Sequence, residues 1–353
     1  MRGYGIKAIN VPGWVEKEKP AAGPLDAVLR PVLISPCTSD LHSMHGGAGP
    51  KEKDRIMGHE AVGEIVEVGA LVREFKVGET VAVPCTTPDW LAPGVQGRFN
   101  AHDRSPLGSF KFLSQKDGVM AEFFHVNQAD ANLARIPEGV APEAALMTVD
   151  MMSTGFYGAE NADIAYGDTV AVIGIGPVGL MTVAGAELRG AGRIIVIGTR
   201  PNCVKAAREY GATDVVSYKN GDLADQVLDL TGGRGADSVI IAGGGAETFG
   251  KAVRMCKAMG TISNVNYFDA ADTLGMPAPA WGLGMADKTI RGGFCPGGRS
   301  RIEKLLDVIK YGRCDPARLI THVFEGFEKI EDATRLMEEK PADLIKPMVR
   351  IRW

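Results

Sequence analysis

The sequence lacks a hydrophobic run long enough to cross a membrane. Spanning a bilayer takes roughly 18 or more consecutive apolar residues, and no stretch of the 353-residue chain reaches that length. The opening residues, MRGYGIKAINVPGW, also lack the apolar core of a secretory signal. We therefore expect a cytoplasmic protein without a membrane partner.

The sequence also lacks a strong excess of charge of either sign. It has 39 Lys and Arg residues against 43 Asp and Glu residues, and the basic residues are interspersed with acidic ones. Proteins that bind nucleic acid usually concentrate basic residues on one surface. Nucleic acid is therefore not an expected partner.

Cysteine is scarce and scattered along the chain. The six cysteines are Cys37, Cys85, Cys203, Cys256, Cys295 and Cys314. Such wide spacing is not typical of a disulfide framework and favours reduced thiols, of which one could bind a metal.

The apolar residues that are present, 45% of the chain, are enough for two domains with separate cores. Residues 27–37, 62–69 and 78–84 are short, β-branched and bounded by Gly or Pro, which predicts strands of a β-rich first domain. Residues 140–159 predict a helix that begins near Pro142. From residue 169 to 266, apolar strands alternate with helical patterns, which indicates a parallel, doubly wound, Rossmann-like sheet.

The C-terminal segment predicts a helix at residues 302–309, a shorter one around residues 336–337, and a last strand at residues 345–351. The pattern alone does not decide whether this segment extends the parallel sheet or returns to the first domain.

The hexapeptide GIGPVG at residues 174–179 matches a phosphate-binding loop. It follows a predicted strand and opens a helix, the context that this motif requires. Gly174 permits the turn, Gly176 lets the backbone approach a pyrophosphate, and Gly179 lets helix and strand pack closely. The helix N-terminus adds amide donors and positive potential. The motif predicts a dinucleotide site.

An acidic residue is missing where the second strand of this domain ends. A site for NAD usually carries Asp or Glu there, whereas this chain has Gly198, Thr199 and Arg200. Gly198 would leave room for a 2′-phosphate, Thr199 could donate a hydrogen bond, and Arg200 could pair with the phosphate. Tyr218, at the end of the third predicted strand, is a further donor. We expect NADP; the alternative is that Arg200 is an ordinary solvated residue.

Two residues of the first domain, Cys37 and His59, have the chemistry of zinc ligands. A catalytic zinc site takes three protein ligands and keeps one position open. The spacing of the sequence does not select a third ligand from the many carboxylates.

Several motifs together resemble one family. They are CTSD at residues 37–40, GHEAVGEIVEVG at 58–69, VPCTTPDW at 83–90, DMMSTGFYGAE at 150–160, GIGPVG at 174–179, GTRP at 198–201, NVNY at 264–267 and GGFCPGGR at 292–299. With them the chain, from residue 1 to about residue 351, resembles the zinc-dependent medium-chain dehydrogenases, and among these the NADP-dependent secondary-alcohol dehydrogenases.

The resemblance implies an α/β protein with two domains. A GroES-like, β-rich catalytic domain would comprise residues 1–152 and 296–353, and a Rossmann NADP-binding domain residues 153–295. It also implies small secondary alcohols and ketones as substrates, and a homotetramer.

The resemblance assigns roles around the metal. It makes Asp150 the third zinc ligand, Glu60 a residue able to move onto the metal, and Asp40 the carboxylate that orients the imidazole. Ser39 would receive the proton of the alcohol and His42 would pass it toward solvent. The alternatives are a helix-start acid for Asp150, a helix cap for Ser39 and a surface histidine for His42.

The resemblance also suggests pocket and cofactor residues. Those near the substrate or a subunit boundary are Cys85, Thr86, Trp90, Phe110, Met151, Tyr267, Phe294 and Cys295, and those near the cofactor include Pro177, Val178, Asn266 and Tyr267. Phe110 stands where tryptophan is expected and Phe294 where leucine is common. Residues 86–130 contain no cysteine, so we expect one catalytic zinc per chain and no structural zinc.

Three other functions are compatible with parts of this pattern. A zinc-free NADPH quinone or enone reductase would use the same architecture, and a non-catalytic NADPH-binding protein would need the cofactor domain alone. A polyol dehydrogenase would use the same metal chemistry on a different alcohol.

Overall fold

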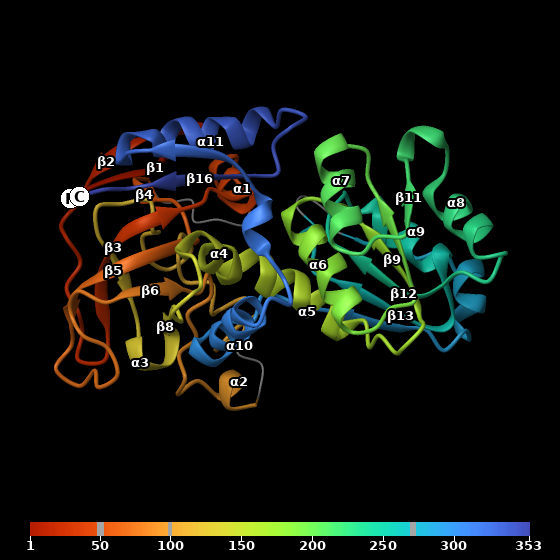
Figure 1. The fold of residues 1–353 in the computed structure, drawn as a ribbon, viewed down its shortest axis with the longest axis horizontal. Coiled ribbons are helices and arrows are strands. Elements are labelled where there is room, and N and C mark those ends of the chain that lie inside the picture. The colour runs from red at the N-terminus through yellow and green to blue at the C-terminus, as the bar shows by residue number, and fades with distance from the viewer. Residues whose placement is uncertain (48–52, 98–100, 269–272) are drawn as a thin grey trace. The chain divides into compact units, whose positions relative to one another are not determined.

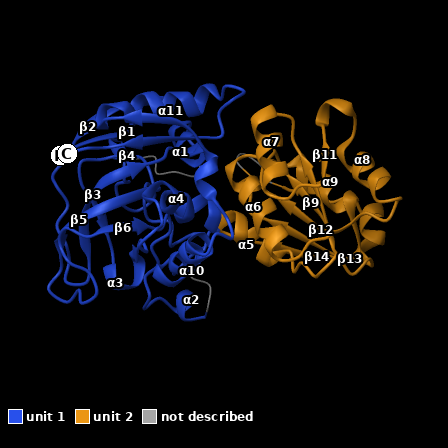
Figure 2. Cartoon of the chain, in the orientation of Figure 1, with its two compact units in different colours: residues 1–153, 295–353 blue, residues 154–294 orange. Residues whose placement is uncertain are grey.

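The computed structural model describes residues 1–47, 53–97, 101–268 and 273–353 (Figure 1). The chain forms two compact units (Figure 2). Unit 1 comprises Met1–Ser153 and Cys295–Trp353, and unit 2 comprises Thr154–Phe294.

Unit 1 is built mainly from strands. A seven-stranded sheet has the order β15-β16-β3-β5-β6-β8, with β7 paired to β3, and a three-stranded sheet has the order β2-β1-β4. The strands are β1 (Arg2–Ala8), β2 (Val11–Glu16), β3 (Ala27–Ile34), β4 (Arg55–Ile56), β5 (Ala61–Val68), β6 (Thr80–Val83), β7 (Phe124–Val126), β8 (Ala134–Arg135), β15 (Ile320–Glu325) and β16 (Lys346–Arg350). The three segments predicted as strands correspond to β3, β5 and β6, and the β-rich first domain is confirmed.

The helices of unit 1 have between four and twelve residues. They are α1 (Thr38–Met44), α2 (Pro93–Gln96), α3 (Ala129–Asn132), α4 (Pro142–Met147), α10 (Arg299–Lys310) and α11 (Ile330–Glu339), with short 3-10 turns η4 (Pro316–Leu319) and η5 (Phe327–Lys329). A core of apolar side chains from both sheets, such as Ile34 and Ile65 of the larger sheet and Ile56 of the smaller one, is almost completely buried. Each such side chain contributes about 1.5–3 kcal/mol by its burial.

The C-terminal segment lies in unit 1. Strand β16 pairs antiparallel with β3 through Val349 opposite Ile34 and Arg350 opposite Leu33. The helices expected at residues 302–309 and around 336–337 are α10 and α11, and the strand expected at residues 345–351 is β16. The sequence pattern had left the place of this segment open.

Unit 2 is a parallel six-stranded sheet with helices between its strands. The strand order is β11-β10-β9-β12-β13-β14 and every pair is parallel, which is the doubly wound arrangement of dinucleotide-binding folds. The strands are β9 (Thr169–Ile173), β10 (Arg193–Ile197), β11 (Asp214–Val216), β12 (Ala236–Ile241), β13 (Cys256–Asn264) and β14 (Thr289–Gly292). The helices are α5 (Ser153–Asn161), α6 (Pro177–Leu188), α7 (Pro201–Glu209), α8 (Leu223–Leu230) and α9 (Glu247–Met255). Two 3-10 turns, η2 (Tyr218–Asn220) and η3 (Pro279–Gly284), complete the unit. The predicted Rossmann-like sheet is confirmed.

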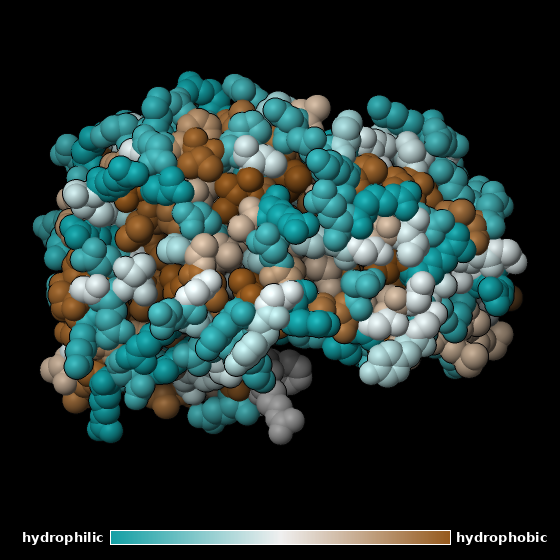
Figure 3. Space-filling view, viewed as in Figure 1, coloured by the Kyte–Doolittle hydropathy of each residue, from teal (hydrophilic) through white to brown (hydrophobic). Residues whose placement is uncertain are grey.

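Among the described residues, no helix combines the length and the apolar character needed to cross a bilayer. On the face drawn in Figure 3, hydrophilic side chains are spread over both units, with apolar side chains in small groups between them.

Candidate metal centre and cofactor site

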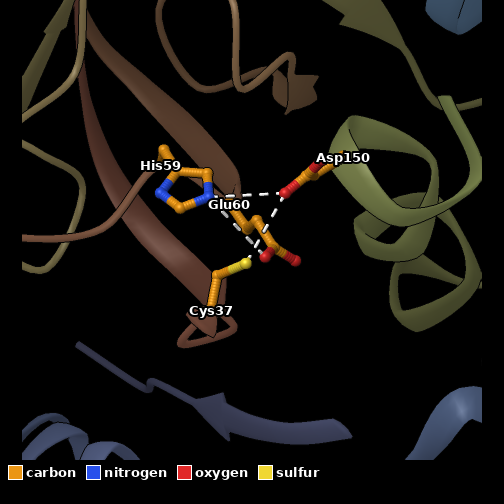
Figure 4. A group of neighbouring side chains, drawn as sticks. All are labelled: Cys37, His59, Glu60 and Asp150. Atoms are coloured by element: carbon orange, nitrogen blue, oxygen red, sulfur yellow. Dashed lines mark hydrogen bonds and ion pairs between the residues drawn. The ribbon is translucent and has the colours of Figure 1, made fainter. Parts of the chain in front are cut away.

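Four side chains from three separate segments converge in unit 1 (Figure 4). Cys37 directly precedes α1, His59 and Glu60 directly precede β5, and Asp150 lies on a helical turn that is 113 residues after Cys37 in the sequence. The Asp150 Oδ2 atom lies 3.3 Å from His59 Nε2 and 3.8 Å from Cys37 Sγ, and Glu60 Oε1 lies 3.9 Å from the same His59 nitrogen.

A π-helical turn presents Asp150 to the other three residues. The predicted helix begins at Pro142 as expected, but a π-turn, η1 (Thr148–Met152), separates α4 from α5. Such a turn carries an extra residue per turn and is common at functional sites because it redirects side chains. The backbone N–H of Cys85 donates a hydrogen bond of 3.1 Å to the Val149 carbonyl within this turn. Asp150 is therefore not an acid at the start of the helix.

The spacing of these atoms fits a tetrahedral zinc ion. Ligand distances of roughly 2.0–2.3 Å place nitrogen, oxygen and sulfur ligands about 3.3–3.8 Å from one another. The His59–Asp150 distance of 3.3 Å and the Cys37–Asp150 distance of 3.8 Å lie in that range. Glu60 Oε2 is buried and has no hydrogen-bond partner among the described residues, so it is available as a further ligand atom.

Asp40 fixes the orientation of the ligands. This fully buried carboxylate lies 3.2 Å from His59 Nδ1 and accepts hydrogen bonds from the backbone N–H groups of Cys37 and Gly58. Burial by itself would lower the pKa of His59, but the Asp40 charge and hydrogen bonds from Asp150, Asp40 and Cys37 raise it well above its usual value. The surrounding groups thus favour positive charge at the centre of the cluster, as a metal ion would supply.

Lys346 is a member of this site that was not predicted. Its Nζ lies 2.6 Å from Glu60 Oε1, and both side chains are buried, with 1% and 0% exposure. Burial is the main cause that raises the pKa of Glu60 to about 7, while the Lys346 charge opposes it. The only available signal was a single lysine in the apolar last strand, and nothing in the sequence linked it to Glu60.

Ser39 lies against the cluster. Its hydroxyl is 3.3 Å from Cys37 Sγ and 3.4 Å from His59 Nε2. The N-cap of α1 is Cys37, and Asp40 completes the capping interaction, so Ser39 is not the helix cap. His42 lies three residues further along α1 and is partly buried.

The expected pocket residues divide between the two units. Those in unit 1 are Cys85, Thr86, Trp90, Phe110, Met151 and Cys295, and those in unit 2 are Tyr267 and Phe294. The Phe110 ring meets the His59 ring edge-on at 5.1 Å between centroids. Trp90 instead donates a hydrogen bond from Nε1 to Asn132. The structure therefore places Phe110 beside His59.

The glycine loop of unit 2 has the geometry of a phosphate cradle. Gly174 has a φ of +88°, and a Cβ at Gly179 would lie 1.8 Å from the Gly174 carbonyl oxygen. A Cβ at Gly176 would meet no protein atom within 4 Å, so this side of the loop is open. Helix α6 begins at Pro177, followed by Val178, and its N-cap Gly176 offers no capping side chain. The amides of the first turn remain available for an anion.

The residues after β10 and β11 meet one another. The Thr199 hydroxyl donates a hydrogen bond of 2.6 Å to the Tyr218 hydroxyl, and Arg200 is the N-cap of α7. Tyr218 lies in the 3-10 turn η2 and not at the end of a strand, because β11 ends at Val216. After β13, Asn266 donates from Nδ2 to the Gly244 carbonyl and is followed by the partly exposed Tyr267.

Gly198 was expected to leave room for a 2′-phosphate, but the structure gives a different reason for a glycine at this position. A Cβ at this position would lie 2.2 Å from Ile175 Cγ1. The space beside Gly198 is therefore filled by a buried side chain of the glycine loop, and glycine is required there for packing.

Comparison with known protein families finds a match to a segment of each unit. Residues 23–138 match the alcohol dehydrogenase GroES-like domain, and residues 177–310 match the zinc-binding dehydrogenase domain. The chain is 56% identical over 349 residues to the NADP-dependent isopropanol dehydrogenase of Thermoanaerobacter brockii, with 99% of each chain covered. The chain belongs to the zinc-binding alcohol dehydrogenases.

Other members of the zinc-binding alcohol dehydrogenases match over the whole chain. The NADP-dependent isopropanol dehydrogenase of Entamoeba histolytica is 54% identical, with 100% of this chain and 96% of the relative covered. The solved structure of alcohol dehydrogenase TADH from Thermus sp. ATN1 superposes with a TM-score of 0.87 at 28% identity, covering 100% of both chains.

Proposed function

We propose that the chain interconverts small secondary alcohols and ketones, of the 2-propanol and acetone type, with NADP(H) as the hydride carrier. The observation that carries this proposal is the convergence of Cys37, His59 and Asp150, with Glu60 beside them. The names of the relatives, NADP-dependent isopropanol dehydrogenases, support the class of substrate and the coenzyme.

Cys37, His59 and Asp150 would hold one catalytic zinc ion per chain, and Glu60 would serve as an exchangeable ligand. A bound zinc ion lowers the pKa of an alcohol hydroxyl and, in the reverse direction, polarises a ketone carbonyl. One thiolate and one carboxylate balance its charge. Asp40 keeps the His59 Nδ1 proton in place, so that Nε2 faces the metal. Because residues 86–130 contain no cysteine, we propose no structural zinc.

Ser39 and His42 would move the proton. The Ser39 hydroxyl lies within hydrogen-bonding distance of two ligand side chains, so it can accept the proton of an alcohol that occupies the open side of the cluster. His42 lies along the same helix, and its imidazole can accept and release a proton, so it would pass the proton toward solvent.

Unit 2 would bind NADP(H), which supplies the hydride acceptor or donor. Gly174, Gly176 and Gly179 shape the loop for the pyrophosphate, with Pro177 and Val178 opening the helix. Thr199, Arg200 and Tyr218 would recognise the 2′-phosphate, and Gly198 would support them by admitting Ile175. Asn266 and Tyr267 would contact the nicotinamide half.

The substrate would contact apolar and small side chains. We propose Cys85, Thr86, Phe110, Met151, Phe294 and Cys295 for this set. Unit 1 would be the catalytic domain and unit 2 the NADP-binding domain of a cytoplasmic homotetramer, with no membrane or nucleic-acid partner.

The test combines metal content with coenzyme and substrate rates. Purified enzyme is expected to contain one zinc per chain, to oxidise 2-propanol faster than sorbitol or butanediol, and to prefer NADP⁺ over NAD⁺. Chelation should abolish turnover without abolishing NADPH binding, and Arg200→Ala should reduce the preference for NADP⁺. Ser39→Ala should lower turnover while zinc content stays unchanged.

Each rival predicts a different result. Full activity after chelation would identify a zinc-free quinone or enone reductase. NADPH binding without turnover of any alcohol or ketone would identify a non-catalytic protein, and faster turnover of sorbitol or butanediol would identify a polyol dehydrogenase.

A further inference from the structure

Two cysteines lie in contact beside the metal centre. The Cys85 and Cys295 sulfur atoms are 3.4 Å apart, although the residues are 210 positions apart in the sequence. Both side chains are buried, with 2% and 3% exposure. One ligand atom from each cysteine and one carboxylate oxygen of Asp150 all lie within 4.8 Å of one another.

The backbone holds the two thiols in this position. The Cys85 N–H donates to the Val149 carbonyl in the π-turn, and the Thr86 hydroxyl donates to the Cys295 carbonyl. A Cβ at Gly297 would lie 2.0 Å from the Thr86 carbonyl oxygen, so only glycine allows the two segments to approach this closely. The arrangement is preorganised and does not depend on flexible side chains alone.

The separation of the sulfur atoms suits a shared metal ion. Two thiolates on one tetrahedral zinc ion lie roughly 3.8 Å apart, given a zinc–sulfur distance of about 2.3 Å. In a disulfide they lie about 2.05 Å apart. The observed 3.4 Å is closer to the first value, so moving the sulfur atoms apart by about 0.4 Å would give them the spacing of two ligands on one ion. Soft cations prefer thiolate ligands.

We propose that Cys85, Cys295 and Asp150 form a second binding site for a thiophilic divalent cation, such as Cd²⁺ or excess Zn²⁺, whose occupation inhibits the enzyme. Binding replaces the two thiol protons with metal–sulfur bonds, and the protons leave to solvent. A carboxylate has two oxygen atoms with about four lone-pair sites, so Asp150 can serve this site and the first one together. The second ion would bind more weakly, because it shares Asp150 and is repelled by the first cation.

The inhibition rests on the proposed function, whereas the binding does not. An ion between Cys85 and Cys295 would share Asp150 with the first site and would occupy space proposed for substrate. A drop in turnover should therefore follow the filling of the second site.

Cadmium is the probe for this site. Full-length enzyme with its resident zinc is titrated with Cd²⁺ under anaerobic, reducing conditions, and both metals are quantified by mass spectrometry. One equivalent of cadmium should bind with thiolate-to-cadmium charge-transfer absorption in the ultraviolet, zinc should stay at one equivalent, and turnover should fall in parallel. A chelator should restore turnover.

Variants separate this site from other thiols. Cys85→Ala and Cys295→Ala should each weaken cadmium binding more than about tenfold and remove the absorption. Cys203→Ala, a buried cysteine in α7, is the matched control and should bind cadmium like the original chain. The proposal is overturned if cadmium displaces the zinc, if both variants retain the absorption, or if the unaltered protein binds no second ion. Absence of resident zinc, with cadmium still bound at the cysteine pair, would instead contradict the proposed function.

Discussion

A buried lysine and a buried glutamate form an ion pair beside the proposed metal centre. Lys346 Nζ lies 2.6 Å from Glu60 Oε1, at 1% and 0% exposure. An isolated charge at such depth is unfavourable, so removing one partner should cost more than removing both.

We expect Lys346→Met to lower the free energy of unfolding by about 3–5 kcal/mol, because it leaves the Glu60 carboxylate buried without its partner. The double variant Lys346→Met with Glu60→Gln should lose less, since no unpaired charge remains. Urea denaturation of the original protein, Lys346→Met, Glu60→Gln and the double variant measures the coupling between the two residues. Lys346→Arg is the conservative control. An equal loss of unfolding free energy in Lys346→Met and in the double variant would show that the unpaired charge is not the cause.

The residues of the proposed metal centre show which parts of a candidate site a sequence can indicate. Cys37 and His59 were predicted as ligands from their chemistry, because such ligands are uncommon and each stood in a recognisable motif. Asp150 came from the family resemblance alone, since nothing in its own neighbourhood separates it from other acids. Lys346 was missed because its contact with Glu60 joins residues 286 positions apart, a distance that no local pattern encodes.

Two glycines of the motif that follows β9, Gly176 before α6 and Gly179 in its first turn, have different physical roles. A Cβ at Gly179 would lie 1.8 Å from the Gly174 carbonyl oxygen, whereas a Cβ at Gly176 would meet no protein atom within 4 Å. One position is restricted by the fold, and the other faces open space where the proposed pyrophosphate would lie.

Alanine at each position should therefore have a different effect. Gly179→Ala should destabilise the protein by about 1–3 kcal/mol, as overpacking does, because backbone must move. Gly176→Ala should leave the melting temperature unchanged but weaken NADPH binding at least about tenfold, or roughly 1.4 kcal/mol. Thermal unfolding and fluorescence titration measure the two effects. Normal NADPH affinity in Gly176→Ala would argue that the cofactor does not lie against this loop.

An ion pair joins the first residues of β10 and β11, at the end of the sheet opposite the glycine loop. The Arg193 guanidinium makes two hydrogen bonds of 2.8 Å to the Asp214 carboxylate, and this interaction lowers the pKa of Asp214 to about 2. The folded-state pKa is depressed, so the pair stabilises the fold above the unfolded pKa of about 4. That contribution is lost as the pH falls toward 2.

Arg193→Ala should lower the free energy of unfolding by only about 1 kcal/mol at pH 7, because the pair is partly exposed to solvent. The difference from the original protein should shrink between pH 4 and pH 2. Urea denaturation over this range measures it, and NADPH affinity at pH 7 should not change. A difference that persists at pH 2 would assign the loss to packing of the arginine.

Several of the strands that the sequence pattern missed are short or lie at the edges of the sheets, although β1 is the middle strand of its sheet. Strand β14 (Thr289–Gly292) is largely exposed, and β15 alternates between partly buried and exposed residues. Edge strands bury one side at most, so their sequences carry little of the apolar signal that identified β9, β10 and β12. The π-turn was missed for a related reason, because it changes the direction of Asp150 without changing the helical pattern around it.

The two units have separate hydrophobic cores. One core contains side chains of residues 1–153 and 295–353 only, and the other contains side chains of unit 2 only. The four proposed metal-binding residues belong to unit 1, and the glycine loop belongs to unit 2. A ligand of one site should therefore stabilise mainly the unit that binds it.

Hydrogen exchange with each ligand tests this independence. A ligand at a hundred times its dissociation constant stabilises the binding state by about 2.7 kcal/mol, so NADP⁺ should slow exchange in β9, β10 and α6 up to about a hundredfold. Strands β3 and β5 should change little. Chelation should accelerate exchange in α1 and in residues 142–152 but not in β9 or β12. Gly176→Ala provides the control, since it should lose the protection by NADP⁺ and keep the response to chelation. Equal protection of β3 and β9 by NADP⁺ would mean that the two cores open together as one cooperative unit.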